Sequence, residues 1–514
     1  MSQTPAAAVD DPDFCISLPD ESATIALAED LAACLAPGDL VCLSGDLGAG
    51  KSTLARALLR AVADDADLEV PSPTFTLVQT YELPRLTVSH FDLYRVEVPE
   101  ELQELGLDEM LETGVALVEW PEMGEGELPA CRLWISLTGA EDDAREARIK
   151  GQGGFDLSGL SRSLEIRAFL RANGFGQASR RFLKGDASAR AYERIDLDGE
   201  SQVLMNSPAL YVVGEQADEN SYAQIVHLAR DVRPFVAVGE ELRRQGFCAP
   251  QIRAMDLERG LLLLEHLGTD GVLDADGKVL PERYRAATEL LAHLHGRSFP
   301  DTVTLPDGSA YRLPVFSRRA LLAEVCLFLD WYVPFVSGAE ASEDLRAEFV
   351  GLWGDVLDRV SGAETGWTLR DYHSPNLLWR GNRSGDDRLG LIDYQDAVIG
   401  ATAYDLGSLL FDARVEVPAD LERELLDTYL VIRAEQAADF DAQAFRSAYA
   451  VYAAQRITKI LGIFVRLARR DGKPVYLNHL PRMNAYLDRA LADPVLSELK
   501  RWFEIHRPAT GADV

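Results

Sequence analysis

The chain has 514 residues, which is too many for one ordinary core and predicts two or three domains, and its 47% hydrophobic content is that of a soluble globular protein. The six cysteines lack C-x-x-C spacing, which argues against a disulfide framework and a zinc site and predicts buried small hydrophobes. The net charge of −32 is concentrated in residues 1–158, where 31 Asp and Glu face 9 Lys and Arg; we expect no direct nucleic-acid binding by this part.

The N-terminal residues and the hydropathy of the chain predict a cytoplasmic protein. Residues 1–14 contain neither a basic residue nor the apolar core of a secretory signal. No apolar run approaches the roughly 18 residues that span a bilayer, so we expect no membrane association. The acidic charge of residues 1–158 has a second explanation, unrelated to binding partners, because solubility or salt adaptation also favours surface carboxylates.

The first chemical motif is a phosphate-binding loop, SGDLGAGKST at residues 44–53. It fits G-x-x-x-x-G-K-S/T and lies between an apolar strand at 40–43 and a helical segment at 53–59. Glycines let backbone N–H groups turn toward phosphate oxygens, the lysine reaches the terminal phosphates and the serine offers a hydroxyl to Mg²⁺. The predicted nucleotide-binding residues are Gly45, Asp46, Leu47, Gly48, Ala49, Gly50, Lys51, Ser52 and Thr53.

Three more apolar segments predict strands at 86–91, 114–120 and 131–137. They alternate with helical or loop segments, which is typical of an α/β domain with a mostly parallel sheet. Asp92 and Glu119 come at strand ends, where a carboxylate can reach the phosphates to hold Mg²⁺ or an attacking water. The alternative is that both residues only cap their strands.

Four motifs of this first part occur in the order of a known family: GDLGAGKS, SPTF, HFDLYR and VEW. Over about residues 14–150 the sequence resembles the TsaE (formerly YjeE) family, P-loop ATPases of bacterial N6-threonylcarbamoyladenosine tRNA synthesis. The resemblance implies that ATP turnover drives cycling of a partner complex of TsaB with TsaD, which handles the tRNA. It also implies that Ser52 binds Mg²⁺, with Glu119 near the metal and Asp92 in the phosphate-sensing region.

Glycines in GQGGFDLSGL, residues 151–160, predict a linker between domains at 1–155 and 160–514. The segments 188–197 and 202–205 flank Asp198-Gly199, a hairpin signal. A helix at 234–245 and a second hairpin through 261–264 follow, and helical periodicity dominates from residue 281, with long helices over 416–503. A small β-rich lobe before a larger helical lobe predicts an α+β bilobal fold with a cleft.

The clearest chemical signal after residue 160 is LRDYHSPNLLW at 369–379, followed by LIDYQD at 391–396. Asp371 and Asn376 have the D-x-x-x-x-N spacing of a kinase catalytic loop, and Asp393 ends an apolar strand. Phosphoryl transfer to an alcohol needs a carboxylate to accept the hydroxyl proton, and an amide oxygen and second carboxylate to hold Mg²⁺. We expect His373 to pack or hydrogen-bond the loop, and His293 and His295 to lie in a core helix, without a third metal ligand.

Five motifs carry a second resemblance: GDASARAYER, VLMNSP, LLLLEHLG, RDYHSPN and IDYQDA. Residues 160–505 resemble the aminoglycoside phosphotransferase superfamily, with its protein-kinase-like fold, and within it the AmgK kinases, which phosphorylate the anomeric hydroxyl of N-acetylmuramate and N-acetylglucosamine. The resemblance implies an adenine-binding hinge at Glu265 to Leu267. Met205 stands where kinases usually have a strand lysine, so the phosphate-binding cation is unassigned among Lys184, Arg190 and Arg194.

The two resemblances together predict a bifunctional enzyme that uses ATP and Mg²⁺ in both parts. Its second part would return recovered cell-wall sugars to precursor synthesis. Two alternatives stay open for that part: an aminoglycoside or other small alcohol as acceptor, and a nucleotide-binding scaffold without catalysis. The presence of Asp371, Asn376 and Asp393 together argues against a scaffold without catalysis.

Overall fold

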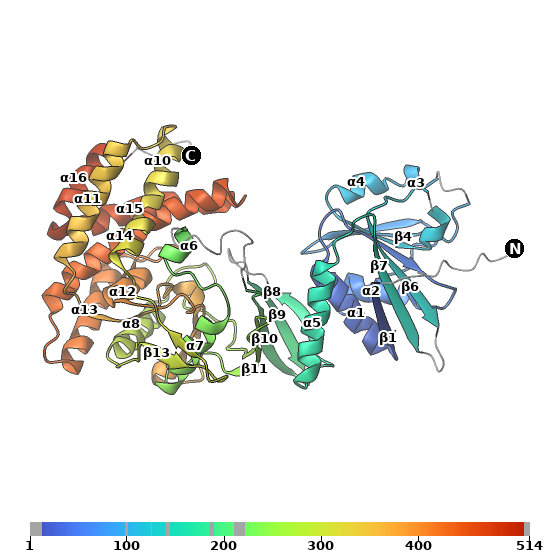
Figure 1. Ribbon diagram of the computed structural model, residues 1–514, viewed down its shortest axis with the longest axis horizontal. Coiled ribbons are helices and arrows are strands. Elements are labelled where there is room, and N and C mark those ends of the chain that lie inside the picture. The colour runs from blue at the N-terminus through green and yellow to red at the C-terminus, as the bar shows by residue number, and fades with distance from the viewer. Residues whose placement is uncertain are drawn as a thin grey trace. The chain divides into compact units, whose positions relative to one another are not determined.

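The computed structural model describes residues 13–97, 101–124, 126–139, 144–183, 190–209 and 221–507. The chain divides into two compact units, Met1–Asn206 and Ser207–Val514, whose elements are labelled in Figure 1. The first unit therefore contains the predicted first domain together with the first strands that follow the predicted linker.

A seven-stranded sheet forms the centre of the first unit, in the order β1-β7-β6-β2-β5-β4-β3. Strands β4, β5, β2 and β6 are parallel, and β1, β3 and β7 pair antiparallel at the two sides. The strands are β1 (Phe14–Leu18), β2 (Leu40–Ser44), β3 (Val78–Glu82), β4 (Thr87–Asp92), β5 (Val115–Glu119), β6 (Arg132–Gly139) and β7 (Arg145–Gln152).

The four parallel strands confirm the predicted α/β domain, and the three antiparallel strands were not predicted. Parallel strands are covered on both faces and read as continuous apolar runs, as the wholly buried β2 and β5 do. Strand β7, REARIKGQ, is only partly buried and carries charged residues. Its weak apolar signal explains why the sequence did not reveal it.

Helices cover both faces of this sheet. Helices α1 (Glu21–Cys34) and α2 (Lys51–Ala63) pack against each other and against one face, in a core that includes Leu31 and Leu58 of the helices and Val41 of β2. The short helices α3 (Glu101–Glu104) and α4 (Leu107–Leu111) belong to the core on the other face. Helix α2 follows β2 directly, which places its N-terminus at the phosphate-binding loop.

The predicted linker is short, because β7 continues to Gln152 and helix α5 (Ser158–Ala172) starts soon afterwards. An antiparallel sheet follows, with β8 (Ser179–Leu183), β9 (Ala191–Leu197) and β10 (Glu200–Asn206). The predicted turn is confirmed: Asp198 and Gly199 both have positive φ, +53° and +82°, as a two-residue hairpin turn requires. Helix α5 and strand β8 were not predicted.

The second unit is mainly helical, as predicted. It contains the predicted helix α7 (Arg233–Arg244) and a hairpin of β11 (Ile252–Asp256) and β12 (Leu261–Glu265). Its other helices of four or more residues are α6 (Tyr222–Ile225), α8 (Pro281–His295), α9 (Arg318–Leu327), α10 (Val333–Ser337), α11 (Glu343–Arg359), α12 (Ala403–Leu410), α13 (Ala419–Gln436), α14 (Ala442–Arg469), α15 (Leu480–Ala490) and α16 (Ser497–His506).

One helical stretch corrects the expectation that no segment is apolar enough to cross a membrane. Arg318–Ser337, which runs from α9 to α10, has the length and composition of a membrane span, with a mean hydropathy of 1.5. It includes the fully buried Glu324, which is paired with Arg370 and Lys459 inside the unit, and α9 packs against α14. These contacts are typical of a core helix, which can be as long and as apolar as a membrane span.

The cysteines also differ in part from expectation. All six are free thiols, in agreement with the predicted absence of a disulfide framework. Cys42 and Cys248 are buried as predicted, whereas Cys15 and Cys131 are exposed. Cys15 lies on the side strand β1 and Cys131 precedes β6, where a side chain can face solvent.

Packing of α14 against α9 generates a stability prediction at Gly462. A Cβ at this position would lie 2.3 Å from the Leu327 carbonyl, so Gly462→Ala should destabilise the fold by about 1–3 kcal/mol through overpacking. Gly351 in α11 is the matched control, because a Cβ there meets nothing within 4 Å and Gly351→Ala should stabilise the helix by about 0.5–1 kcal/mol. Urea unfolding of both variants measures the difference, and equal effects would contradict the packing argument.

Candidate functional sites

The phosphate-binding loop connects β2 to α2. Gly45, Gly48 and Gly50 have φ of +147°, +83° and +102°, a region that favours glycine. A Cβ at Gly45 would lie 2.5 Å from the carbonyl oxygen of Leu137, so this position also has no space for a side chain. The loop's conformation therefore requires its glycines, as the motif predicted.

Lys51 is held at the start of α2 with its ammonium inside the loop. Its Nζ donates to the carbonyl oxygens of Gly45 at 2.6 Å and Asp46 at 3.0 Å, and lies 3.5 Å from the centre of the Trp120 ring. Burial lowers the pKa of Lys51, and the nearby carboxylates, Glu119 first, oppose that shift. This places the ammonium where the loop's backbone curves, as a phosphate-binding lysine requires.

Two predicted carboxylates lie side by side, because β4 and β5 are parallel and Asp92 is in register with Glu119. Glu119 accepts a hydrogen bond from the Ser52 hydroxyl at 2.7 Å, and its other oxygen is 2.8 Å from Nε2 of His90. The structure therefore brings Ser52 and Glu119 together as predicted. His90 is a site residue to which sequence reasoning assigned no role, although it lies in the HFDLYR motif.

Asp92 connects the end of β4 to the SPTF segment. Its Oδ2 accepts from the hydroxyls of Ser72 and Thr74, both at 2.7 Å. Its Oδ1 accepts from the backbone N–H of Tyr94 at 3.1 Å. Asp92 therefore does cap its strand, the alternative that the sequence left open, and it also holds the SPTF segment at the end of β4.

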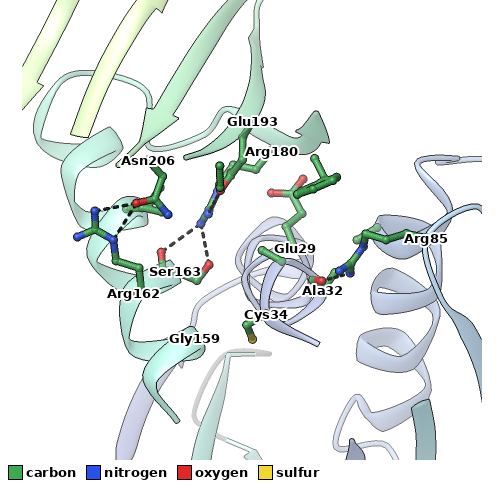
Figure 2. A pocket seen from close by; sticks show the side chains of 15 residues that line it. Glu29, Ala32, Cys34, Arg85, Gly159, Arg162, Ser163, Arg180, Glu193 and Asn206 are labelled. Carbon is green, nitrogen blue, oxygen red and sulfur yellow. Dashed lines mark hydrogen bonds and ion pairs between the residues drawn. The ribbon is translucent and has the colours of Figure 1, made fainter. Parts of the chain in front are cut away.

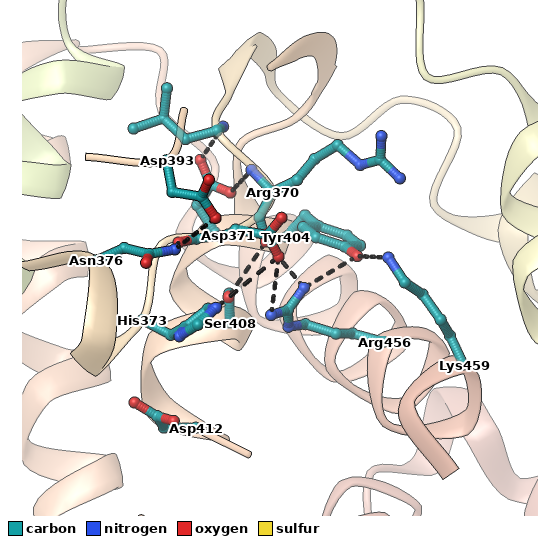
Figure 3. Close-up of polar contacts among 12 residues, drawn as sticks. Arg370, Asp371, His373, Asn376, Asp393, Tyr404, Ser408, Asp412, Arg456 and Lys459 are labelled. Atoms are coloured by element: carbon teal, nitrogen blue, oxygen red, sulfur yellow. Dashed lines mark hydrogen bonds and ion pairs between the residues drawn. The ribbon is translucent and has the colours of Figure 1, made fainter. Parts of the chain in front are cut away.

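The second predicted site gathers around the loop after β15 (Thr365–Thr368) and the hairpin of β16 (Leu377–Trp379) with β17 (Leu389–Leu391). The Asn376 amide donates to the Asp371 carbonyl at 2.9 Å and to Oδ2 of Asp393 at 3.5 Å. The Gln395 amide donates to the other Asp393 oxygen at 2.9 Å. Figure 3 shows Asp371, Asn376 and Asp393 turned toward one another, so the structure brings the three predicted residues together.

Two fully buried carboxylates, absent from the sequence prediction, shape this loop. Asp405 in α12 accepts from the backbone N–H groups of Leu369 at 2.6 Å and Arg370 at 2.8 Å. Asp412 accepts from the N–H of Ser374 at 2.8 Å. These bonds satisfy loop amides that no strand partner can reach, including that of Arg370, whose φ is +68°.

A buried ion network lies beneath the loop. Glu324, fully buried in α9, accepts from Arg370 at 2.6 Å and Lys459 at 2.8 Å. Arg456, one helical turn before Lys459 on α14, donates to the carbonyl oxygen of Arg370 at 2.8 Å, and a second guanidinium nitrogen lies 3.5 Å from Oδ1 of Asp371 (Figure 3). Arg456 and Lys459 are thus site residues that sequence reasoning missed.

This environment keeps Asp371 ionised. Burial raises the pKa of Asp371, but the positive groups around it, Arg456 first, outweigh burial and lower the pKa to about 2. About a third of the side chain, 34%, is exposed. An ionised and accessible carboxylate is what a general base for an alcohol needs.

The two histidines of α8 differ: His295 is buried as expected, whereas the His293 side chain is 41% exposed. His373 is largely buried, with Nε2 3.9 Å from Oδ1 of Asp371, and burial lowers its pKa. His293 pairs with Asp386 at 2.8 Å, and Nδ1 of His295 lies 2.7 Å from the Tyr429 hydroxyl. Each of the two α8 histidines is thus engaged by a different partner.

Within the described ranges of the chain there is no group of three or more His, Cys, Asp and Glu side chains that could bind a metal ion. Mg²⁺ typically takes one or two protein oxygens and completes its shell with phosphates and water. Ser52 with Glu119, and Asn376 with Asp393, supply such oxygens and fit a metal that arrives with a nucleotide.

The candidate phosphate-binding cations have different surroundings. Met205 is buried, and the β9–β10 register pairs it with Tyr192 and pairs Val203 with Arg194. Alternation along each strand therefore places Arg194 on the same face as Met205, where its Nε donates to Asp196 at 2.8 Å. Arg190 is half-buried, and Lys184 lies outside the described residues, as does GDASA, the first half of GDASARAYER.

The predicted hinge follows β12. The Glu265 N–H donates to the Gln251 carbonyl at 2.8 Å, and its carboxylate lies 3.7 Å from Arg380. Leu267 is buried and covers Gly390 of β17, where a Cβ would lie 2.8 Å from it. The hinge segment therefore packs directly on the hairpin that precedes Asp393.

The Arg456 contact generates a prediction about pH dependence. Arg456→Gln removes the strongest influence that lowers the pKa of Asp371, so that pKa should rise in the variant. Because the base works only when ionised, the kcat/KM of the predicted phosphoryl transfer should begin to fall at a higher pH in the variant than in the parental chain as the pH is lowered. Arg446→Gln is the control, since Arg446 is on the same helix but pairs with Asp427 at the surface. Identical profiles for Arg456→Gln and the parental chain would contradict the assignment.

Known proteins match the two parts of the chain separately. Residues 18–147 match the family "Threonylcarbamoyl adenosine biosynthesis protein TsaE", and residues 179–446 match the "Phosphotransferase enzyme family". The tRNA threonylcarbamoyladenosine biosynthesis protein TsaE of Rickettsia bellii is 38% identical over 26% of this chain and 93% of its own length.

Two relatives match the remainder. The N-acetylmuramate/N-acetylglucosamine kinase of Caulobacter vibrioides is 38% identical over 66% of this chain and 95% of its own length. The enzyme of the same name from Pseudomonas putida is 31% identical over 65% of this chain and 91% of its own length. The chain therefore belongs to the TsaE family through its N-terminal part and to the phosphotransferase enzyme family, as a homologue of these sugar kinases, through the rest.

Proposed function

We propose that this chain is a bifunctional enzyme. Its first part is an ATPase of tRNA threonylcarbamoyladenosine synthesis, and its second part transfers phosphate from ATP to the anomeric hydroxyl of N-acetylmuramate or N-acetylglucosamine in the recycling of cell-wall sugars. The observation that carries the second activity is the accessible Asp371 carboxylate, which the fold brings together with Asn376 and Asp393. The relatives named above support the choice of acceptor.

In the sugar kinase, Asp371 orients the acceptor hydroxyl and takes its proton as the oxygen attacks the terminal phosphate. Two contacts hold the base in place: the hydrogen bond that the Asn376 side-chain amide donates to the Asp371 carbonyl, and the ion pair of the Asp371 carboxylate with the Arg456 guanidinium. Asn376 and Asp393 would hold Mg²⁺, which when bound neutralises phosphate charge. Arg190 or Arg194 would supply the remaining positive charge, and Glu265 and Leu267 would border the adenine.

An aminoglycoside is the competing acceptor. Such polycations require an acidic pocket, but the residues after 158 carry 52 Asp and Glu against 42 Lys and Arg, an excess too mild to decide, so the choice of acceptor rests on the sugar-kinase relatives. The purified chain should therefore phosphorylate N-acetylmuramate or N-acetylglucosamine with ATP and leave kanamycin unmodified. If the chain phosphorylates kanamycin and neither amino sugar, the proposed acceptor is wrong.

For the first part we propose a function through protein partners, TsaB and TsaD, in the cytoplasm. The net charge of −22 that follows from its 31 acidic and 9 basic residues opposes direct contact with tRNA. Lys51 would contact the terminal phosphates, with Ser52 and Glu119 at Mg²⁺ and Asp92 sensing the phosphate through the SPTF segment. We place the boundary between the two activities at residues 155–160, between the two family matches.

The separation of the two nucleotide sites generates a prediction at Lys51. Lys51→Ala should abolish ATP hydrolysis by the first part, because it removes the cation that reaches the terminal phosphates. Sugar phosphorylation should continue at the parental rate, since the second site has its own ligands. Both rates are measured on the same preparation, and loss of both in a folded variant would contradict two independent sites.

The general-base role generates a prediction at Asp371. Asp371→Asn keeps the shape but cannot accept the proton, so kcat for sugar phosphorylation should fall by roughly 10² to 10⁴ with a smaller change in KM for ATP. Asp393→Asn should instead weaken Mg²⁺-ATP binding as well as turnover, because it removes charge from the metal site. Steady-state kinetics with folding checked by thermal melting tests both, and near-parental turnover by Asp371→Asn would refute the assignment.

A further inference from the structure

A cluster of buried charges joins helix α1 of the ATPase part to elements that follow the linker. Asp30 on α1 is 2% exposed. It accepts from the Ser163 hydroxyl at 3.3 Å and from Nε of Arg167 at 3.2 Å, both on α5. It also accepts from Nη1 of Arg180 on β8. All these donors come from residues 163–180, beyond the ATPase part.

The cluster continues from β8 to β9. Arg180 binds both oxygens of Glu193, with Nε at 2.6 Å and Nη2 at 2.8 Å, a two-pronged geometry that fixes direction as well as distance. Figure 2 shows Arg180 and Glu193 together beside Ser163, at a pocket that Glu29 of α1 also lines. Asp30, Arg180 and Glu193 thus form a continuous chain of contacts from α1 to β8 to β9.

This chain of contacts affects the position of Arg190 and Arg194, the candidate phosphate-binding residues, because both are attached to the backbone of β9 or next to it. Successive side chains of a strand point to opposite faces, so Glu193 faces the cluster and Arg194 faces the other side. Arg190 directly precedes the strand. A fixed Glu193 therefore fixes the orientation of the backbone from which both arginines project.

Burial makes Asp30 necessary for this arrangement. Arg167 and Arg180 are 5% and 6% exposed, and removing one carboxylate from a buried group of charges leaves the positive charges only partly compensated, which is unfavourable. Arg167 retains Glu29 at 2.8 Å and Arg180 retains Glu193. Asp30 is the carboxylate that forms ion pairs with both arginines and so connects α5 to β8.

We propose that Asp30 is a positioning residue for the sugar kinase: the ATPase part supplies, through α1, a brace for the strands that carry the kinase's phosphate-binding arginines. This rests on the proposed function for the role of Arg190 and Arg194. The brace is independent of the P-loop chemistry, because Asp30 lies on α1 and the loop residues lie between β2 and α2. Fusion of the two parts then has a structural consequence for the second activity.

The test uses the full-length chain with Asp30→Asn, and with Glu21→Gln as the matched control on the exposed first turn of the same helix. Hydrogen exchange of the β8 and β9 amides should accelerate at least about tenfold in Asp30→Asn, and exchange in β16 and β17 should stay unchanged. In sugar phosphorylation, KM for ATP should rise at least about fivefold with KM for the sugar unchanged. Asp30→Glu, which keeps the charge, should restore most of both.

Unchanged exchange in β8 and β9 would overturn the proposal, whatever the chain phosphorylates. Faster exchange throughout the chain, or equal increases in both KM values, would also overturn it, because Asp30 would then serve only general stability. If the parental chain phosphorylates no amino sugar, the proposed function fails, while localised exchange in Asp30→Asn would still support the brace. If Asp30→Asn does not fold, the same measurements are made on Arg167→Lys.

Discussion

The second unit depends on one constraint: charges buried beneath the loop that carries Asp371 must be paired. Glu324 has no solvent exposure, and its partners Arg370, Lys459 and Gln455 come from a loop and from α14. Removing one partner of such a group typically costs about 3–5 kcal/mol. The network therefore holds α9, α14 and the Asp371 loop in one arrangement, and the position of Arg456 against Asp371 follows from it.

The same constraint appears at the backbone. The loop that carries Asp371 is not part of a strand ladder, so its N–H groups need other acceptors when they are buried. Asp405 and Asp412 provide them, and both carboxylates are fully buried. The loop can adopt the positive φ of Arg370 because these bonds compensate for its strain.

The two candidate sites are assembled by different means. In the first unit, parallel strands end at the same edge, so Asp92 and Glu119 meet through register alone and Lys51 follows from the start of a helix. In the second unit, a loop and a hairpin bring Asp371, Asn376 and Asp393 together, and distant helices hold them. The buried Asp30 cluster adds a link between the ATPase part and the strands that follow it.

The sequence by itself determined the features whose physics is local. The phosphate-binding loop, the Asp198-Gly199 turn and the spacing from Asp371 to Asn376 each lie within a few residues, where backbone conformation and residue type are directly coupled. The buried parallel strands were also readable, because burial on both faces leaves a continuous apolar run. The side strands β1, β3 and β7 lack that run and were missed.

Only the tertiary structure decided which distant charges meet. Asp405, Asp412, Glu324 and Arg456 lie 35 or more residues from the loop groups they contact, and Asp30 lies 150 residues from Arg180. In the sequence each of them reads as an ordinary polar residue of a helix or loop. Their roles arise because burial makes an unpaired charge unfavourable, and the partner that satisfies it is chosen by packing rather than by spacing.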